Sequence, residues 1–541
     1  MLERYNFFRC ITASALIAAP LFCGYINANA ENVTADDFII DFSDDNAELY
    51  RYIGEDSTVT VPDYIDGVSV NSINENLFPP ECKSRLYSVV WQSTLNVPPK
   101  IFRDAVSLSD VSFEPHKIAI GESAFENTPI KKLILPYNTI VGNNAFLDCI
   151  RLESLTIGNG STNILNGAFM DTFSLKEIVF PENAEKVTIG ENSFASCGFI
   201  GPVPNINLFF ALMKLASCGL SHVEIPSYVE KIQKDAFNNC FDLKEVTLNG
   251  TTDIADDAFS ECWTLSNINI DLDSDLNGGA FSNCINLMNI NGEPVINDDG
   301  SLVSKFEDFI TRNFKDTHEI GFINKYTAYC IRKMVNENIS HSMTEVQKVK
   351  ALHDAVCNMV TYDDYNNYHD DVSVFLTNQT ICDGYARLMN LLLHEAGFET
   401  CYVRNLSHAW VIVKVCGYYF HLDPTWDDFD TISYDWFLKD DSYVRNEPDS
   451  HATWLLEVPS SLHSFQKNEL PVCDTVIGDV NKDGCVDALD ASIVLTEYAD
   501  VSVGLPMSLE LILADCNFNG RIDAVDASKI LQIYTQNSVS D

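Results

Sequence analysis

The sequence predicts a multidomain protein with three folded parts: a solenoid of stacked α/β repeats, an α+β domain built around one cysteine, and a small all-α module with two calcium loops. Three observations predict this order. An Ala-Phe or Ser-Phe pair recurs through the first half of the chain, a cysteine stands directly ahead of a helix-like run in the second half, and an acidic loop pattern occurs twice near the C-terminus. The 541 residues allow about three domains of ~100–200 residues each.

The N-terminal segment is typical of a cleaved export signal. Arg4 and Arg9 precede an apolar run, and Ala-Asn-Ala at 28–30 has the small-x-small pattern that signal peptidase requires. We therefore predict a signal peptide over 1–30 and an N-terminal lead-in over 31–56. The alternative, a retained membrane anchor, is disfavoured because a proline and a glycine interrupt the apolar run.

The overall charge restricts the partners. The formal net charge is −44, so nucleic acids and anionic membranes are disfavoured because like charges repel across such contacts. No later apolar segment is long enough to span a bilayer, so no membrane insertion is expected. The mature protein is expected to be secreted and extracellular, with calcium as a counterion.

The recurring pair predicts a solenoid over 57–291. Each turn would supply one short strand, starting about six residues after the phenylalanine, and a return path. Such a turn is too small to bury its own apolar face, so neighbouring turns must stack into one core. One step is double and is expected to be filled by Leu215, while Phe78 and Phe102 extend the register to about ten turns. The pairs are Ala124-Phe125, Ala145-Phe146, Ala168-Phe169, Ser193-Phe194, Ala236-Phe237, Ala258-Phe259 and Ala280-Phe281.

A column of cysteines stands three residues after the phenylalanines. One residue type at one phase of a solenoid forms an inward-facing ladder, in which a thiol packs as a small apolar group. Export would favour disulfides, but each thiol of a ladder has two equivalent neighbours, so buried free thiols are expected. These are Cys149, Cys197, Cys218, Cys240, Cys262 and Cys284.

The repeat unit resembles the BspA-like leucine-rich repeats of bacterial surface antigens. "AFNNCFDLKEVTL" at 236–248 fits the unit of that family closely. The resemblance implies a leucine-rich-repeat solenoid that offers an extended surface for a protein partner.

The second half of the chain changes to helical patterns. Apolar residues at helical spacing predict a helix over 343–360, and a second helix is expected to begin at Asp383 and to stop at Gly397. Cys382 then lies at a helix N-terminus, where unpaired N–H groups and the macrodipole favour a thiolate. The ladder cysteines lack this setting.

Two strands follow this helix. "LSHAWVIVKV" and "GYYFHLDPTWDD" predict a hairpin that turns at Cys416-Gly417, with His408 at its start and Asp423 at its end. In such a ribbon the two positions are roughly opposite, so imidazole and carboxylate are expected to meet on one face. A thiol, an imidazole and an orienting carboxylate form the general arrangement for acyl transfer by cysteine.

The three blocks "TICDGYARLMNLLLHEAGFET", "HAWVIV" and "HLDPTWDD" resemble the transglutaminase-like superfamily, in its order and close to its spacing. The resemblance implies a papain-like α+β domain over 300–465. It implies Cys382 as nucleophile, His408 as general base and then acid, and Asp423 as the residue that orients the histidine. Thr380 departs from the glycine that many relatives carry two residues before the cysteine.

The resemblance leaves the reaction open. After attack on a carboxamide, the oxyanion would be stabilised by the backbone N–H of Cys382 and by a second donor, Gln379 or Tyr362. Water attacking the thioester gives a peptidase or amidase, and a lysine amine gives a cross-link; hydrolysis is favoured because bacterial members are often regarded as peptidases. Zinc binding by the same three residues is disfavoured because paired CxxC or HxxxH spacing is missing.

Two copies of a calcium loop close the chain. Oxygen ligands alternate around a glycine at position 6, as an EF-hand loop requires, and the carbonyl at position 7 completes the set. The first loop would use Asp479, Asn481, Asp483, Cys485, Asp487 and Asp490; the second would use Asp515, Asn517, Asn519, Arg521, Asp523 and Asp526. Two calcium ions are therefore expected, bound more weakly by the second loop because it has one acidic ligand fewer.

Each loop is followed by an exiting helix, from about Ala488 and Ala524, and no entering helix is expected. This truncated duplicate resembles a dockerin over 472–537, which implies a cohesin module of a scaffoldin as partner. The sequence thus predicts a scaffold-attached cysteine acyl-transfer enzyme acting on protein or peptide substrates. The alternative is a non-catalytic adhesion or substrate-binding component of a cellulosome for polysaccharide breakdown.

Overall fold

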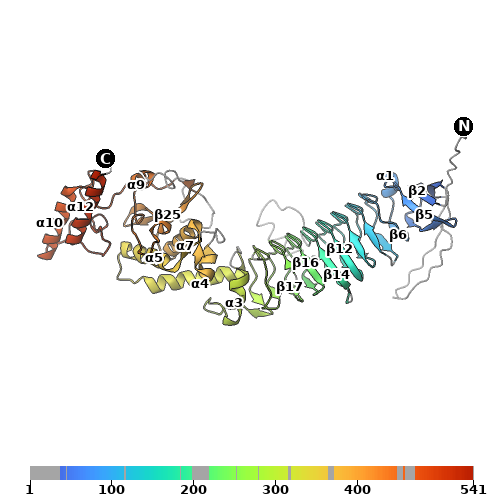
Figure 1. Cartoon of the computed structure of the whole chain (residues 1–541), viewed down its shortest axis with the longest axis horizontal. Coiled ribbons are helices and arrows are strands. Elements are labelled where there is room, and N and C mark those ends of the chain that lie inside the picture. Colours follow the sequence, from blue (N-terminus) through green and yellow to red (C-terminus); the bar gives the residue numbers. More distant parts are fainter. Residues whose placement is uncertain are drawn as a thin grey trace, which may run out of the picture. The chain divides into compact units, whose positions relative to one another are not determined.

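The computed structural model of the chain describes residues 37–43, 46–114, 117–182, 184–197, 219–250, 253–277, 279–314, 319–363, 371–446, 455–456 and 470–539. The predicted signal peptide lies outside these residues. The chain divides into two compact units, one of Met1–Asn297 with Leu302–Ile323 and one of Asp298–Ser301 with Asn324–Asp541 (Figure 1). None of the helices in the described part is both long and apolar enough to cross a lipid bilayer.

The first unit begins with a four-stranded sheet. Its strands are β1 (Phe38–Ser43), β2 (Asn46–Tyr52), β4 (Tyr64–Ile65) and β5 (Val68–Ile73), in the order β1-β2-β5-β4. The helix α1 (Pro80–Lys83) follows. The predicted lead-in therefore contributes two strands of this sheet.

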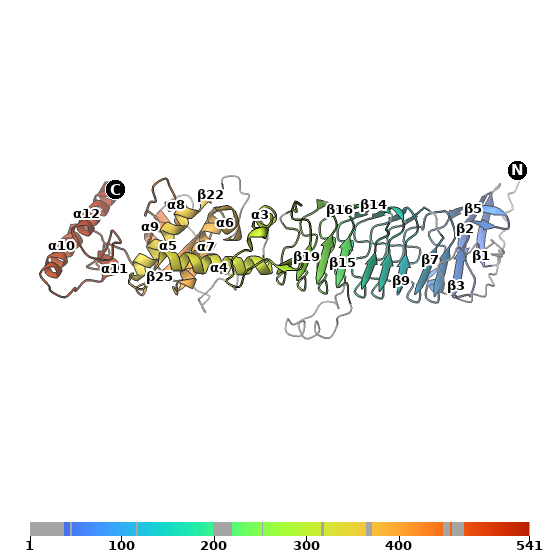
Figure 2. The ribbon, with the colours of Figure 1, turned by 90° about the horizontal axis from the view of Figure 1, so that it is seen from below.

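Two rows of short strands then form the solenoid (Figure 2). One row consists of β3 (Thr58–Val61), β6 (Ser88–Trp91), β7 (Asp110–Phe113), β9 (Lys132–Ile134), β11 (Ser154–Thr156), β13 (Glu177–Val179), β15 (His222–Ile225), β17 (Glu245–Leu248), β19 (Asn267–Asn269), β20 (Asn289–Ile290) and β21 (Glu293–Pro294). The other is one parallel sheet of β8 (Ile118–Ile120), β10 (Thr139–Val141), β12 (Gly160–Ile164), β14 (Ala184–Ile189), β16 (Val229–Ile232) and β18 (Asp253–Ile254). The expectation of one strand per turn was wrong for these turns, because the predicted return path pairs with its neighbours as well.

The recurring phenylalanines stack along the solenoid core. From Phe102 to Phe281, neighbouring rings lie 5.0–5.3 Å apart and within 20° of parallel. Phe194 stacks directly on Phe237 at 5.1 Å, which leaves no room for another ring. Leu215, which was expected to fill the double step, lies outside the described residues.

The cysteine ladder is confirmed as a row of buried free thiols, except for Cys218, which lies outside the described residues. Each described thiol lies 3.2–3.8 Å from the phenylalanine carbonyl of the preceding turn, as between Cys262 and Phe237. Thr128 and Thr172 occupy the same column and donate to their own turn's carbonyl at 2.8 Å. The side chains of this column thus donate hydrogen bonds to buried backbone carbonyls. The first unit ends with α3 (Ser304–Asn313).

The second unit contains an α+β domain. Its helices are α4 (Gly321–Asn338), within which the chain passes from one unit to the other, α5 (Glu345–Met359), α6 (Asp371–Thr377), α7 (Cys382–Glu395), α8 (Pro424–Asp427) and α9 (Asp441–Asn446). Its strands are β22 (Thr361–Tyr362), β23 (Gln379–Thr380), β24 (Thr400–Arg404), β25 (Ala409–Val415), β26 (Tyr418–Leu422) and β27 (Leu455–Leu456).

The strands β26-β25-β24-β27 form one antiparallel sheet, and α7 packs against its central strands. The apolar face of α7 supplies Tyr385, Leu388, Met389, Leu392 and Leu393 to the core, the stripe that the sequence predicts. The nucleophile candidate is therefore carried by the central helix of the domain.

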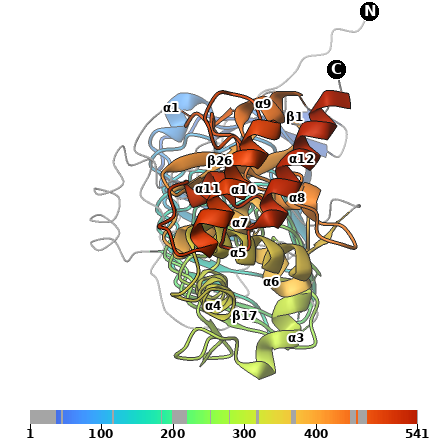
Figure 3. The ribbon, with the colours of Figure 1, turned by 90° about the vertical axis from the view of Figure 1, so that its left-hand side faces the viewer.

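The C-terminal part holds α10 (Ala488–Ser502), α11 (Leu511–Ala514) and α12 (Ala524–Val539). The helices α10 and α12 lie side by side (Figure 3). The expectation that no helix precedes the loops was wrong for the second loop, because the four residues of α11 lead into it. The core of this part contains Val494, Ala527 and Ile530.

Candidate active site and calcium loops

Cys382 is the first residue of α7. The preceding residue, Ile381, is extended (φ −98°, ψ −177°) and offers no side-chain cap, so the first N–H groups of the helix have no capping side chain at that position. Asp383 adds a carboxylate to the first turn, and Gly397 stands after the end of the helix with φ +89°. The half-buried thiol thus lies where the helix dipole favours negative charge.

His408 and Asp423 form a buried pair. Nε2 of His408 lies 2.5 Å from Oδ2 of Asp423, and the carboxylate is fully buried. Burial by itself would lower the pKa of His408, but the charge and hydrogen bond of Asp423, together with Cys382, outweigh it and raise this pKa to about 10. Because Nε2 is engaged by Asp423, Nδ1 is the nitrogen available to the thiol.

The hairpin register differs by two residues from the expected one. Val411 pairs with Leu422, so Asp423 stands across from position 410 and not from 408. The imidazole and the carboxylate are therefore diagonal neighbours, a separation that longer side chains bridge. They still meet on one face, because positions 408 and 410 point to the same side of the strand.

Asp423 is held by the backbone on both sides. Its Oδ1 accepts from the N–H of Thr425 at 3.0 Å, and its own N–H donates to the carbonyl of Trp436 at 3.1 Å. Oδ1 thus caps the N-terminus of α8. This leaves the other oxygen fixed in direction toward His408.

Two tryptophans surround the imidazole. Trp410 is fully buried and stacks on His408, with ring centroids 5.7 Å apart and planes within 18°. Trp426 meets His408 edge-on at 6.0 Å and is 39% exposed. Both rings thus pack around the imidazole of the site.

The two proposed oxyanion donors lie on the short strands ahead of α7. Gln379 and Tyr362 belong to β23 and β22, which pair with each other. Tyr362 is 44% exposed, and its ring lies 6.3 Å from that of Tyr385. Both candidate donors thus belong to the strand pair that precedes Cys382.

The sequence did not predict a second buried imidazole that supports this region. His353 on α5 lies 3.2 Å from Asp427, and both side chains are fully buried. Asp427 also accepts from the hydroxyl of Ser433 at 2.6 Å and from the N–H of Trp436 at 3.0 Å. The pair therefore ties α5 to the segment that follows Asp423. The first acid of "TWDD" was the available signal, since a buried aspartate needs partners.

The two acidic loops have the same internal hydrogen bonds. In the first, Asp479 accepts from the N–H groups of residues 483 and 484; in the second, Asp515 accepts from those of 519 and 520. Asp490 and Asp526 likewise each accept from the N–H groups three and nine residues earlier. The loops are thus two copies with one geometry.

The residues of these loops fit a calcium ion. Gly484 and Gly520 take the left-handed conformation at φ +90° and +87°, and the four carboxylates at positions 1 and 12 are buried. Burial raises the pKa of Asp515 to about 6 and also raises that of Asp526, so a bound cation would stabilise their charged forms. The side chains of Cys485 and Arg521 are exposed, so these residues have only their carbonyls to offer.

Three family models match the chain. The BspA type leucine-rich repeat region matches residues 71–200 and 214–326 in six copies, the transglutaminase-like superfamily matches 332–424, and the dockerin type I domain matches 477–532. The chain therefore carries BspA-type repeats, a transglutaminase-like domain and a type I dockerin, in this order. Dockerins of this type generally bind calcium.

Solved structures resemble separate parts of the chain. A leucine-rich repeat protein of T. pallidum has 17% identity and TM-score 0.19, and covers 49% of this chain and 83% of its own. One from Bacteroides ovatus has 16% and 0.21, covering 53% and 98%. A structure titled as a TGase has 19% and 0.20, covering 37% and 56%. No curated protein matches the chain.

Proposed function

We propose that the chain is an extracellular cysteine-dependent acyl-transfer enzyme that acts on protein, is anchored to a cohesin-bearing scaffold by its calcium-dependent dockerin, and uses the repeats to bind protein. The observation that carries this proposal is the buried 2.5 Å contact between His408 and Asp423 beside a thiol at a helix N-terminus. A purely structural cysteine has no need of an imidazole oriented in this way.

The residues suggest the following steps. The Cys382 thiolate attacks the carbon of a carboxamide, and the backbone N–H of the same residue stabilises the oxyanion. The C–N bond then breaks as Nδ1 of His408 gives its proton to the leaving amine, which leaves a thioester. Water or a lysine amine attacks the thioester, His408 takes the proton from the attacking group, and the thiolate is restored.

A labelled-amine assay tests this proposal and separates its two branches. The full-length protein is incubated with a glutamine-containing protein substrate and a labelled primary amine. Incorporation of the amine that is lost in Cys382→Ala indicates cross-linking, and release of ammonia or peptides without incorporation indicates hydrolysis, the branch we favour.

A null result must be told apart from a wrong substrate. Alkylation of Cys382 by iodoacetamide near pH 7, followed by peptide mapping, needs no substrate. A rate that is as low as that of the buried thiols, and is unchanged in His408→Ala, would leave a non-catalytic, scaffold-attached adhesion component as the function of this chain.

A further inference from the structure

A third histidine lies on the same face of the hairpin as the candidate site. His421 in β26 pairs directly with Ile412 in β25, which places its side chain on the side of Trp410 and Asp423. His421 is 1% exposed, and Trp410 is fully buried. The acyl-transfer steps above do not use His421, so its burial needs another explanation.

The hydrogen bonds of His421 fix its tautomer. Nε1 of Trp410 lies 2.9 Å from Nδ1 of His421, and an indole nitrogen only donates. Nδ1 must therefore be without a proton, and the single proton of the neutral ring is on Nε2. Nε2 lies 3.0 Å from Oδ1 of Asp441, to which it donates.

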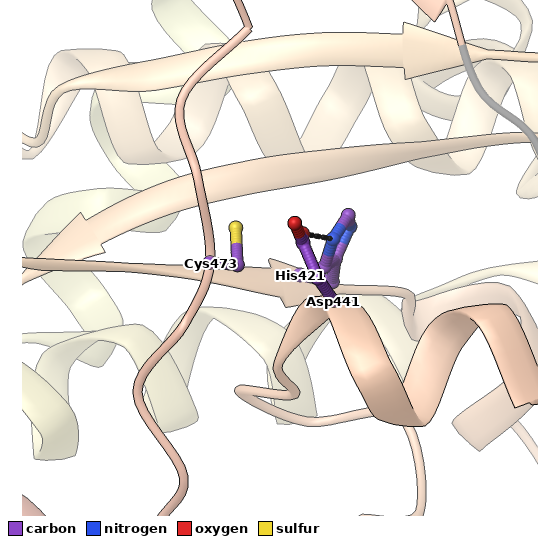
Figure 4. Close-up of side chains that lie close together, drawn as sticks. All are labelled: His421, Asp441 and Cys473. Atoms are coloured by element: carbon purple, nitrogen blue, oxygen red, sulfur yellow. Dashed lines mark hydrogen bonds and ion pairs between the residues drawn. The ribbon is translucent and has the colours of Figure 1, made fainter.

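Asp441 is itself held in place by other groups. Arg445 lies 3.3 Å from its Oδ2, and its backbone N–H donates to the carbonyl of Cys473 at 2.7 Å. Burial would raise the pKa of Asp441, but the hydrogen bond from His421 and the charge of Arg445 outweigh it and lower this pKa. An ionised carboxylate thus accepts a hydrogen bond from the imidazole N–H of His421 (Figure 4).

A metal site is the competing explanation, since ligand atoms of His421, Asp441 and Cys473 lie within 4.8 Å of one another. A cation on Nε2 would displace its proton while Nδ1 still accepts from Trp410, which would leave the ring with no proton at all. Burial and the neighbouring carboxylates also raise the pKa of Cys473, which disfavours the thiolate that a metal needs. The group therefore fits a hydrogen-bonded support better than a cation site.

We propose that His421 is a positioning residue of the acyl-transfer site: oriented by Asp441, it accepts the indole N–H of Trp410 and so fixes the ring on which His408 stacks. This inference rests on the proposed function for its effect on reactivity. A small displacement of a reacting group lowers rates by on the order of tenfold to a hundredfold. Without its acceptor, the buried indole N–H would turn toward another partner and move the surface that supports His408.

The test uses the full chain and compares four variants. His421→Leu removes the acceptor, and Trp410→Phe removes the donor but keeps a ring. His421→Asn places an amide oxygen near the position of Nδ1 and is expected to rescue. Cys401→Ala is the matched control, because Cys401 is buried in the same apolar cluster and takes no part in these bonds.

Two measurements decide the outcome. The rate of Cys382 alkylation at pH 7 is expected to fall about tenfold or more in His421→Leu and Trp410→Phe, and by less than threefold in His421→Asn and Cys401→Ala. In protein labelled with ¹⁵N-tryptophan, the Trp410 indole resonance, assigned by its loss in Trp410→Phe, is expected to shift most in His421→Leu, where the acceptor is lost, less in His421→Asn, where an oxygen replaces it, and least in Cys401→Ala.

Several results would overturn the inference: a native rate in folded His421→Leu, an equal loss in Cys401→Ala, an unshifted indole resonance, or stoichiometric zinc that His421→Leu loses. Failure of the proposed function looks different. Native Cys382 would then react as slowly as the buried thiols, while the indole resonance would still report whether His421 holds Trp410.

Discussion

The side chain of Thr380 occupies the space that a side chain at position 384 would need. A Cβ on Gly384 would overlap Oγ1 of Thr380, and Thr380 is fully buried. Thr380 stands where many transglutaminase-like proteins carry glycine, and Gly384, the third residue of α7, leaves room for its side chain. The two residues together let β23 approach the helix that begins at Cys382.

This contact predicts the effect of a methyl group. Gly384→Ala is expected to destabilise the domain by about 1–3 kcal/mol, because overpacking a rigid site forces the backbone to shift. The shift would also move Cys382, so its alkylation should slow. Urea unfolding and peptide mapping measure the two effects.

A double variant is the control for this prediction. Thr380→Gly in the Gly384→Ala background restores the space, so it should recover most of the lost stability. If Gly384→Ala is as stable as the native protein and its Cys382 reacts at the native rate, the contact does not constrain the site.

The His408–Asp423 pair predicts a pH dependence. The pKa of His408, about 10 in the folded state, lies above the ~6.5 of a histidine in an unfolded chain. The stabilisation is therefore complete below pH ~6.5 and is lost as the pH rises toward 10. Turnover that needs the protonated imidazole should likewise decline only near pH 10.

Asp423→Asn tests this dependence. In this variant, the alkaline limb of the pH–rate profile should shift to lower pH by more than one pH unit. The free energy of unfolding should also fall less between pH 6.5 and 10 than it does in the native protein. Asp430→Asn, at an exposed position nearby, should leave both unchanged. An alkaline limb that stays in place in Asp423→Asn would contradict the assignment of this pKa to the pair.

The thiols are expected to differ in reactivity. Burial raises the pKa of Cys149 to about 11 and places those of Cys197 and Cys240 well above the usual value, so these thiols should resist alkylation until the solenoid unfolds. Cys416 is an informative comparison, because the residue as a whole is exposed. Partial burial of its thiol, together with the negative charge of Glu345, raises the pKa of Cys416 to about 11. Peptide mapping at pH 7 should thus show Cys382 labelled well before Cys416. Equal rates would remove the distinction on which the active-site proposal depends.

The buried pair of His353 and Asp427 is expected to stabilise the domain. Removing one partner leaves the other charged and buried, which costs about 3–5 kcal/mol. Burial would lower the pKa of His353, but hydrogen bonds to Asp354 and Asp427 raise it well above the usual value. The substitution His353→Ala therefore removes a cation that pairs with Asp427. His394→Ala, on the exposed side of α7, should change the free energy of unfolding by less than ~0.5 kcal/mol. Similar values for both variants would refute the role of the pair.

The dockerin is expected to depend on calcium. Chelation leaves buried carboxylates facing one another, so the helical signal of α10 and α12 and the affinity for a cohesin should be lost together. The second loop has one acidic ligand fewer, so titration calorimetry should resolve a weaker second site that Asp515→Ala abolishes, while Asp479→Ala removes the stronger one. Full helicity and cohesin affinity in chelator would exclude this dependence.

The sequence predicts the site better than it predicts the strands around it. The calcium loops and the stripe of α7 are recognisable because their ligands or apolar positions lie within one loop or one helix. The second strand row was missed because its strands are two to six residues long and depend on neighbouring turns for their hydrogen bonds. The two-residue offset between His408 and Asp423 depends on the hairpin turn, which the pattern fixes only approximately.

Buried polar partners were the least predictable feature. No local pattern gives His353 or His421 a role, and only tertiary contacts distinguish them from His394 at the surface. Their partners Asp427 and Asp441 lie 74 and 20 residues away along the chain. Separations of this kind are set by the fold and not by a local motif.

The equal spacing of the phenylalanine rings affects how the solenoid can change in evolution. Phe194 and Phe237 are 43 positions apart, yet they meet at the same distance as rings from consecutive turns. An added segment can therefore leave the stack at one turn and rejoin it at the next without altering the neighbours. Duplication or deletion of whole turns would leave the same ring-to-ring contact at the junction, so natural variants with longer or shorter arms should remain foldable.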